Sequence, residues 1–215
     1  MAIDPHILYV GGRNHSTQVR LFSMDFDQLD EFDLGRIEFS HAHPWANYIR
    51  GVCDQLLKAG HHLEGMDIVL QGNVPQGSGL SSSAAVEVGA ALLMNELHEL
   101  GISRVELVKL SQRAENQFVG VNCGIMDQFA SMMGQSGHAL FLDCRSLAHE
   151  LVPTGFEKMG YSVVVINSGV KRGLVDSEYN KRRSQCGQAV ELLKRDLPGI
   201  TALRDVTVEH LPLIN

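Results

Sequence analysis

The stretch MDIVLQGNVPQGSGLSSSAAVEVGAALLM, residues 66–94, decides the fold of this chain. An apolar, strand-like run ends at Leu70, and a turn at 72–75 leads into the glycine loop 77–79, three serines and a long apolar run. Glycines let the backbone approach an anion closely. A helix N-terminus offers unpaired N–H groups at the positive end of its dipole. We therefore predict a phosphate site where this strand, loop and helix meet.

The three serines after the loop, Ser81, Ser82 and Ser83, have two readings. They can cap the helix that we expect from about residue 82 to 97, before Gly101. They also place hydroxyls where a phosphate or its metal ion would lie. The residues alone leave open a plain glycine turn followed by a serine-capped helix.

The loop matches neither of the two common phosphate-binding patterns. A Walker A loop needs G-x-x-x-x-G-K-[ST], and the sequence has no lysine between Lys58 and Lys109. The dinucleotide pattern G-x-G-x-x-G would need a glycine at Ser82. The stretch thus indicates a phosphate site of another kind.

Composition indicates an ordinary globular protein of one large domain or two small ones. The chain has 215 residues, 44% hydrophobic and 20% charged. Its net charge of -7 argues against a nucleic-acid partner, and the one dense basic patch, 181–183, is short. We find no apolar span of 18 residues and no signal-peptide pattern, so we expect a cytoplasmic protein without a membrane partner.

The four cysteines, Cys53, Cys123, Cys144 and Cys186, are scattered along the chain. They form no C-x-x-C pair, and no histidine lies at ligand spacing from them. We therefore expect buried thiols in a reducing compartment rather than disulfides or a zinc site.

Strands and one helix are expected before the glycine loop. The strands are 7–10, 19–24 and 36–39, with Gly11-Gly12 as a hairpin turn between the first two. A proline opens an amphipathic helix at 44–59. Trp45 and Tyr48 lie on its apolar stripe, either as core anchors or as an aromatic wall against an adenine ring.

Two carboxylates after the loop are candidates for chemistry. Glu115 lies on a helix expected at 104–119, and reads either as a solvated or salt-bridged carboxylate or as a metal ligand if it comes near Ser83. Asp127 lies at the start of a further helix. There it either stabilises the helix N-terminus or faces a pocket as a general base.

The remaining pattern predicts two more strands and a long helix. The strands are 138–142 and 162–167, the second nearly continuous in apolar residues and therefore expected in the centre of a sheet. The helix starts near Ser177 and stops before Pro198. No repeat or linker marks a domain boundary, which we place near residue 155.

The segment GNVPQGSGLSSSA, residues 72–84, resembles the ATP-binding motif of the GHMP small-molecule kinases. The segments PWANYIRG, AENQFVGVNCGIMDQ, HALFLDCRSL and SEYNKRRSQC resemble, in order and spacing, the galactokinases of that family. This resemblance implies an α+β chain with the GHMP kinase fold: a ribosomal-protein-S5-like α/β domain at 1–155, cut short at its start, and the beginning of a C-terminal α+β domain at 156–215.

The resemblance also implies roles for individual residues. Transfer of the ATP γ-phosphate to the C1 hydroxyl of galactose would use ATP and Mg²⁺, with Asp127 taking the proton from the attacking hydroxyl. Ser83 and Glu115 would hold the magnesium ion. Gly124, Asp127 and Tyr179 would contact the sugar. The ATP-binding residues would be Gly77, Ser78, Gly79, Leu80, Ser81, Ser82 and Ser83, with Trp45 and Tyr48 near the adenine.

Two family motifs do not occur in this sequence. GRVNLIGEHTDY would supply an arginine beside the aspartate and most sugar contacts, and Met1–Asp4 resembles the residues that follow it. The GGGFGG segment is also missing, so the resemblance covers roughly the central half of a galactokinase. We expect weak or no turnover, since one lost electrostatic group costs about 10²- to 10³-fold in rate. We also expect self-association through an unpaired sheet edge. A non-catalytic galactose- and ATP-binding regulator of the same fold is the alternative.

Overall fold

The computed structural model of the chain describes residues 1, 3–75, 79–166 and 178–213. The chain divides into two compact units, Met1–Lys171 and Arg172–Asn215. The strands are β1 (Ile7–Arg13), β2 (Gln18–Ser23), β3 (Gln28–Asp33), β4 (Met66–Gly72), β5 (His138–Leu142) and β6 (His149–Pro153). The α-helices are α1 (Asn47–Lys58), α2 (Ser82–Leu97), α3 (Arg104–Arg113), α4 (Met126–Met133) and α5 (Glu178–Leu193).

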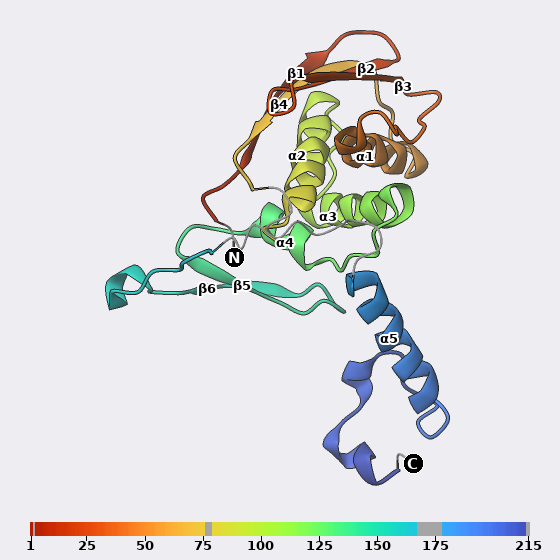
Figure 1. Cartoon of the computed structure of the whole chain (residues 1–215), viewed down its shortest axis with the longest axis vertical. Helices are drawn as coiled ribbons and strands as arrows, with labels where there is room; N and C mark the ends of the chain where they lie inside the picture. Colours follow the sequence, from red (N-terminus) through yellow and green to blue (C-terminus); the bar gives the residue numbers. More distant parts are fainter. Residues whose placement is uncertain (2, 76–78, 167–177, 214–215) are drawn as a thin grey trace. The chain divides into compact units, whose positions relative to one another are not determined.

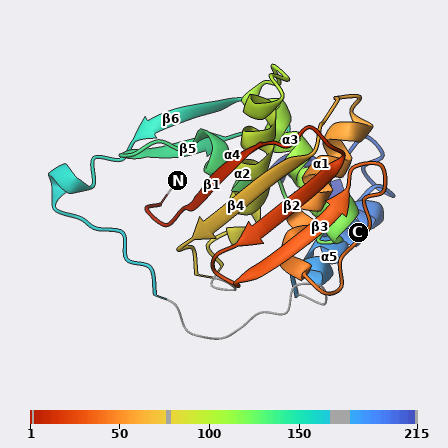
Figure 2. The same ribbon diagram turned by 90° about the horizontal axis from the view of Figure 1, so that it is seen from above.

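The first unit is built on a mixed sheet with the strand order β1-β4-β2-β3, seen face-on in Figure 2. β4 pairs antiparallel with β1 and parallel with β2, and β2 pairs antiparallel with β3. The helices α1 and α2 lie against one face of this sheet (Figure 1). The main core therefore lies between the sheet and these helices, and includes Leu21, Ile49, Ile68 and Met94.

The expected hairpin turn at Gly11-Gly12 is wrong, because both glycines lie inside β1. β1 and β2 do not pair with each other but lie on either side of β4. A Cβ atom at Gly11 would approach the carbonyl oxygen of Asp67 to 2.9 Å. This glycine therefore permits close contact between neighbouring strands, which is the other common use of glycine in a sheet.

The expected strand at 36–39 is also wrong, and the third strand is β3. β3 has the acidic sequence QLDEFD, and one of its inward residues is Asp30, which is only 3% exposed. The Arg50 side chain from α1 donates its Nε–H to Asp30 Oδ2 at 2.9 Å, and His43 Nδ1 lies 3.0 Å from Oδ1. A strand with a buried charged residue that another element neutralises lacks the alternating apolar pattern by which strands are predicted from sequence.

The helix expected at 44–59 is confirmed as a 3-10 turn, Pro44–Ala46, followed by α1. The helix expected at 82–97 is confirmed as α2. Close packing fixes α2 on the sheet, since a Cβ atom at Gly89 would lie 2.5 Å from Tyr9 Cε2. The Tyr9 hydroxyl donates to the Val86 carbonyl at 2.7 Å.

The expected strand at 138–142 is confirmed as β5, which pairs antiparallel with β6. β6 was not predicted from the sequence. Residues 162–166 form no strand in the described part of the chain, and residue 167 lies outside it. Val164 is 76% exposed and Ile166 87% exposed, so the expected central strand is wrong for these residues. An apolar run is a buried strand only where neighbouring strands pair with it.

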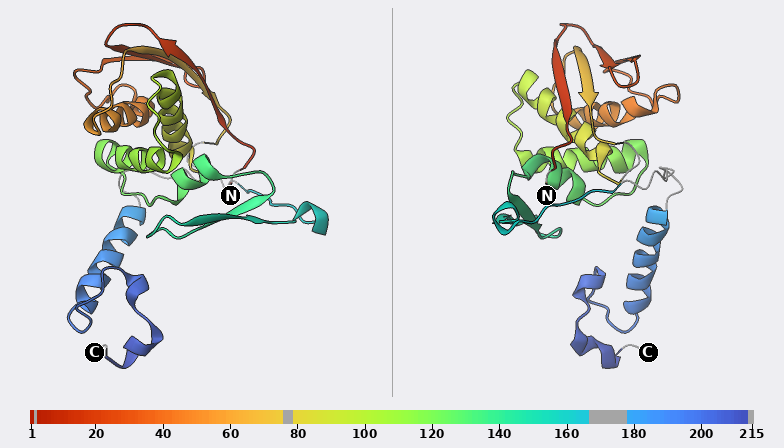
Figure 3. Two further views of the ribbon diagram at one scale, coloured as in Figure 1. Left: turned by 180° about the vertical axis from the view of Figure 1, so that it is seen from behind. Right: turned by 60° about the vertical axis from the view of Figure 1, so that its left-hand side comes forward.

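The second unit contains α5 and two short 3-10 helices, Leu203–Asp205 and Val208–Leu213 (Figure 3). α5 confirms the expected long helix from about residue 177 to before Pro198. A small core of Val190, Leu197 and Ile200 holds this unit together. The boundary expected near residue 155 stays a prediction.

Two expectations about the cysteines need correction. All four thiols are free, and Cys53 is buried as expected, but Cys144 and Cys186 are exposed. Exposed cysteines occur where a thiol carries no packing role, and the spacing of cysteines in a sequence gives no measure of burial.

Among the described residues, no helix has the length and apolarity that crossing a membrane requires.

Candidate active site

Ser81 is the residue just before the first turn of α2, and its backbone is left-handed with φ 58° and ψ 42°. The preceding Gly79 is also left-handed, with φ 80°. Ser81 occupies the N-cap position, but its side chain makes no capping hydrogen bond. The expectation of a side-chain cap is therefore wrong at Ser81. The first-turn N–H groups of α2 are not taken up by that hydroxyl, and a left-handed residue other than glycine is typical of a functional turn.

The loop residues of the expected ATP site are only partly described. Gly77 and Ser78 lie outside the described residues. Leu80, Ser82 and Ser83 are described and half-buried, and Ser83 lies in the first turn of α2. The serine hydroxyls are therefore attached to a rigid helix start.

The expected helix at 104–119 ends as a π-helix, Ala114–Val119, which carries Glu115. Gly51 of α1 allows this segment to come close, because a Cβ there would lie 3.2 Å from Ala114 Cβ. π-helical turns inside helices are frequent at functional sites. Glu115 is 5% exposed, so the reading as a solvated surface carboxylate does not describe it.

Within the described part of the chain, the buried Glu115 carboxylate is held by hydrogen bonds and forms no salt bridge. Its Oε2 atom accepts from Gln128 Nε2 at 2.7 Å and from Cys123 Sγ at 3.1 Å. The same Gln128 Nε2 donates to Glu87 Oε2 at 3.2 Å. Glu115, Glu87, Gln128 and Cys123 form what we call the carboxylate cluster.

Electrostatics in the carboxylate cluster favour the protonated form of Glu87. Burial raises the pKa of Glu87 well above its ordinary value, and the neighbouring Glu115 raises it further. Burial also raises the pKa of the Cys123 thiol, with Glu115 as the next cause. Glu87 and Cys123 therefore enter the cluster as neutral groups.

The three residues expected to do the chemistry lie around this cluster. Glu115 is a member of it. Ser83 lies four residues before Glu87 on α2, hence on the same helix face, and Asp127 directly precedes Gln128 in the first turn of α4. α2 packs against both α3 and α4. The fold therefore places Ser83 and Asp127 each within one helical turn of a residue of the carboxylate cluster.

Two members of the cluster were missed from the sequence. Glu87 is a lone acidic residue in the apolar run AAVEVGAALLM, and Gln128 ends the segment CGIMDQ. A charged residue in the apolar part of a helix is a usable signal, because such a residue is seldom fully buried without a partner.

Trp45 and Tyr48 have different neighbours. Trp45 stacks on Phe26 with ring centroids 6.1 Å apart, and its Nε1–H donates to Gln28 Oε1 at 2.9 Å. Tyr48 lies near the carboxylate cluster: burial raises its pKa, and Glu115 raises it further. Trp45 therefore packs against the hairpin of β2 and β3, whereas Tyr48 faces the carboxylate cluster, and these contacts give the two rings no neighbour in common. Their contact with adenine stays a prediction.

The expected sugar contacts are described only in part. Gly124 is half-buried in the loop before α4. The Cys123 N–H, next to it, donates to Asn116 Oδ1 at 2.9 Å, which holds this loop against the π-helix. The side chain of Tyr179 lies outside the described residues.

The residues present fit a magnesium ion that is shared with phosphates. Among the described residues, no group of three or more His, Cys, Asp and Glu side chains forms a metal cage by itself. Mg²⁺ bound with a nucleotide usually takes one or two protein carboxylates plus phosphate oxygens. The Glu115 carboxylate and the Ser83 hydroxyl are hard oxygen donors of this kind.

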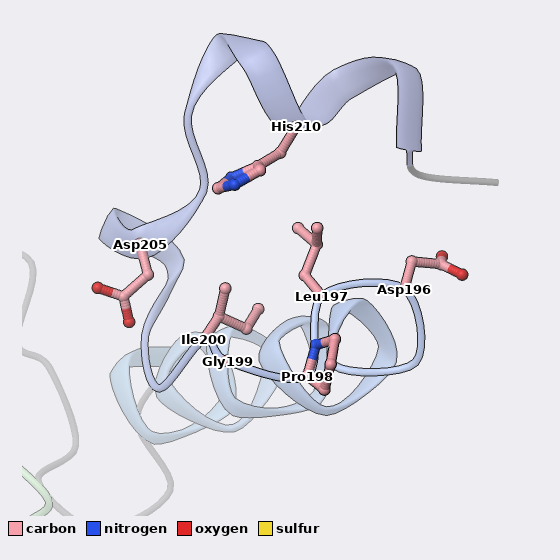
Figure 4. Close-up of a pocket in the computed structure, with 7 residues that line it drawn as sticks. All are labelled: Asp196, Leu197, Pro198, Gly199, Ile200, Asp205 and His210. Atoms are coloured by element: carbon pink, nitrogen blue, oxygen red, sulfur yellow. The ribbon is translucent and has the colours of Figure 1, made fainter.

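A cavity of about 460 Å³ in the second unit is lined by Leu197, Ile200, Asp205 and His210, among others (Figure 4). None of the expected site residues lines it. We assign it no part in the site, because the carboxylate cluster lies in the other unit.

Comparison with known proteins identifies the class. Residues 47–135 match the model of the GHMP kinases N terminal domain. The mevalonate kinase of Methanococcus jannaschii has a similar fold, with a TM-score of 0.59 at 19% identity over 74% of this chain and 49% of that one. The chain has the GHMP kinase fold, and its segment 47–135 matches the N-terminal domain of that family.

The chain is also similar to galactokinases over nearly its whole length. It is 43% identical to the galactokinase of Clostridium acetobutylicum over 91% of this chain and 50% of the relative. Identity to the Chloroflexus aurantiacus galactokinase is 45%, over 99% of this chain and 54% of the relative. The structure of Lactococcus lactis galactokinase complexed with galactose gives a TM-score of 0.86 at 31% identity, over 99% of this chain and 56% of that one. The chain spans about half the length of the curated relatives it matches.

Proposed function

We propose that the chain is part of an ATP-dependent sugar 1-kinase of the galactokinase type. It would transfer the γ-phosphate of ATP to the C1 hydroxyl of galactose. The observation that carries the proposal is the carboxylate cluster. It joins Glu115 to Gln128, the neighbour of Asp127, and to Glu87, one helical turn from Ser83. The similarity to galactokinases over nearly the whole chain supports this choice of substrate.

The residues would act together in phosphoryl transfer, where positioning and charge neutralisation supply most of the rate. The backbone N–H groups at the start of α2 bind the phosphates. Ser83 and Glu115 would hold a magnesium ion, which would supply positive charge to the phosphates of the nucleotide. Asp127 takes the proton from the attacking C1 hydroxyl and orients that oxygen. Gly124 and Tyr179 contact the sugar, and Tyr48 and Trp45 lie toward the nucleotide.

A sugar is the partner that we propose, and N-acetylgalactosamine is a less favoured substrate than galactose.

We also propose self-association through β1, which is an edge of the sheet in the described part of the chain.

A coupled ADP-release assay with galactose, run beside calorimetric titration of Mg²⁺–ATP and of galactose, tests the proposal. Galactose-dependent ADP release supports the kinase. Binding of both ligands without ADP release would instead indicate the non-catalytic regulator. Binding of neither ligand would contradict both functions and leave only the fold.

A further inference from the structure

Gln128 occupies the centre of the carboxylate cluster. Its side chain is fully buried, and its Nε2 atom lies 2.7 Å from Glu115 Oε2 and 3.2 Å from Glu87 Oε2. A primary amide nitrogen carries two hydrogens, so this one group can donate to both carboxyl groups at once. The two acidic side chains thus meet at a single neutral donor.

Gln128 and Cys123 hold Glu115 through the same carboxylate oxygen. Among the described residues, the donors Gln128 Nε2 and Cys123 Sγ both reach the same oxygen, Oε2. A carboxylate fixed through one oxygen presents its other oxygen in a defined direction. Partners of this kind orient metal ligands, and their loss typically weakens metal binding about 10- to 100-fold.

The hydrogen bonds of Gln128 fix α4 as well as the two carboxyl groups. Gln128 follows Asp127 in the first turn of α4, so its anchoring in the cluster also fixes the backbone that carries Asp127. The cluster contacts reach α2 through Glu87 and the π-helix through Glu115. One side chain therefore joins the three elements that carry the expected chemistry.

We propose that Gln128 is a positioning residue that holds Glu115 through Oε2 and so leaves Glu115 Oε1 for the metal of a bound metal–nucleotide complex. This inference rests on the proposed function, because it gives the residue that sets the geometry of the proposed metal ligand. Gln128 itself contacts neither metal nor substrate in this assignment.

The test compares Gln128→Met with Gln112→Met in the full chain. Gln112 is a matched control, since its Nε2 atom donates at 3.3 Å to the Cys123 carbonyl in the same loop and not to a carboxylate. Binding of Mn²⁺ with a non-hydrolysable ATP analogue is measured by electron paramagnetic resonance, and binding of the analogue alone is measured in EDTA. We expect Gln128→Met to weaken Mn²⁺ binding about 10- to 100-fold with little change in metal-free binding, and Gln112→Met to change Mn²⁺ binding less than threefold.

A rescue variant separates positioning from simple support of the fold. In Glu87→Gln/Gln128→Met, the new amide at position 87 lies within reach of Glu115, so Mn²⁺ affinity should recover most of its loss. Gln128→Asn, which keeps a polar side chain, replaces Gln128→Met if thermal melting shows the latter unfolded, and it should show the same selective loss. Equal weakening of metal-bound and metal-free binding, unchanged Mn²⁺ affinity, or no recovery in the double variant would overturn the inference.

The wild-type chain distinguishes the two levels of the proposal. If it binds the analogue more tightly with Mn²⁺ and Gln128→Met behaves like wild type, only the role of Gln128 is wrong. If the wild type shows no metal-dependent binding, the proposed function fails and takes the inference with it.

Discussion

Glu115 shows how one residue acquires its chemistry from its surroundings. The side chain is buried on a π-helical turn and is fixed by Gln128 and Cys123. Burial of a carboxylate without a positive charge beside it is unfavourable, and a cation relieves the cost. This is the physical reason for expecting a metal-dependent site at Glu115 rather than a structural ion pair.

Replacing Asp127 by asparagine keeps the shape of the side chain and removes the base. We expect galactose-dependent ADP release to fall at least about 100-fold, because a positioned base contributes roughly 10²- to 10⁴-fold. Mg²⁺–ATP affinity should stay within threefold of wild type. Turnover that survives within tenfold would rule out the assigned role.

Replacing Glu115 by glutamine removes the proposed metal ligand while keeping its size. Mg²⁺–ATP affinity measured by calorimetry should fall about 10-fold or more, whereas ATP affinity in EDTA should hardly change. Glu106→Gln is the control, because Glu106 lies on the same helical segment and is paired with Lys109 on the surface. Unchanged magnesium dependence in Glu115→Gln would remove this residue from the metal shell.

The elements that could be predicted are those marked by residues next to them in the sequence, such as a glycine loop or a proline before a helix. α2 is a long apolar run after a glycine loop, and its bounds agree with the sequence prediction. β3 was missed from the sequence, because its buried Asp30 is paired with Arg50 and interrupts the apolar pattern. A strand at 162–166 was wrongly predicted, because this apolar run has no partner strand in the described part of the chain. The carboxylate cluster could not be derived, since Glu87, Glu115 and Gln128 meet only through tertiary packing.

The contact between α2 and β1 can be tested at Gly89. Replacement by alanine places a Cβ atom 2.5 Å from Tyr9 Cε2. We expect a loss of about 1–3 kcal/mol in the free energy of unfolding from this overpacking, measured by urea denaturation. Gly12→Ala is the matched control, because a Cβ there has no neighbour within 4 Å. A stabilised Gly89→Ala variant would contradict the packing described here.

Acid pH should weaken the link between β4 and β2. Hydrogen bonds from Arg20, and then from Asn14, hold the pKa of Asp67 below its ordinary value of 3.8. The resulting stability is present above pH 3.8 and is lost as pH falls through the lowered pKa. Asp67→Asn should therefore lose less stability than wild type between pH 4 and pH 2. The effect is about 1 kcal/mol or less because the pair is half exposed; parallel acid curves would contradict it.

At the scale of the whole molecule, the four free thiols report on burial in different parts of the chain. Burial raises the pKa of Cys53 to about 12, so its thiolate is scarce as well as inaccessible. Cys144 and Cys186 should react with a thiol reagent at once at pH 8, Cys123 slowly and Cys53 only in denaturant. Mass spectrometry of timed samples gives the order, and early labelling of Cys53 would contradict the core.

The family resemblance carried information about the whole chain that periodicity did not. The segments CGIMDQ and DCRSL carried the resemblance, and CGIMDQ contains Asp127 and Gln128. The GHMP kinase fold that the resemblance implies is confirmed by comparison. The residue patterns alone left Glu115 open between a surface carboxylate and a ligand. The difference arises because a ligand set is a property of several elements together, whereas a sequence pattern describes one element at a time.

The central claim is that Ser83, Glu115 and Asp127 surround one metal–nucleotide site. Crystals grown with Mn²⁺ and a non-hydrolysable ATP analogue test it most directly through the anomalous scattering of manganese. The account predicts a peak within about 2–2.5 Å of Glu115 and Ser83 oxygens, with the terminal phosphate directed toward Asp127. A manganese peak away from Glu115, or a nucleotide bound elsewhere in the chain, would contradict it.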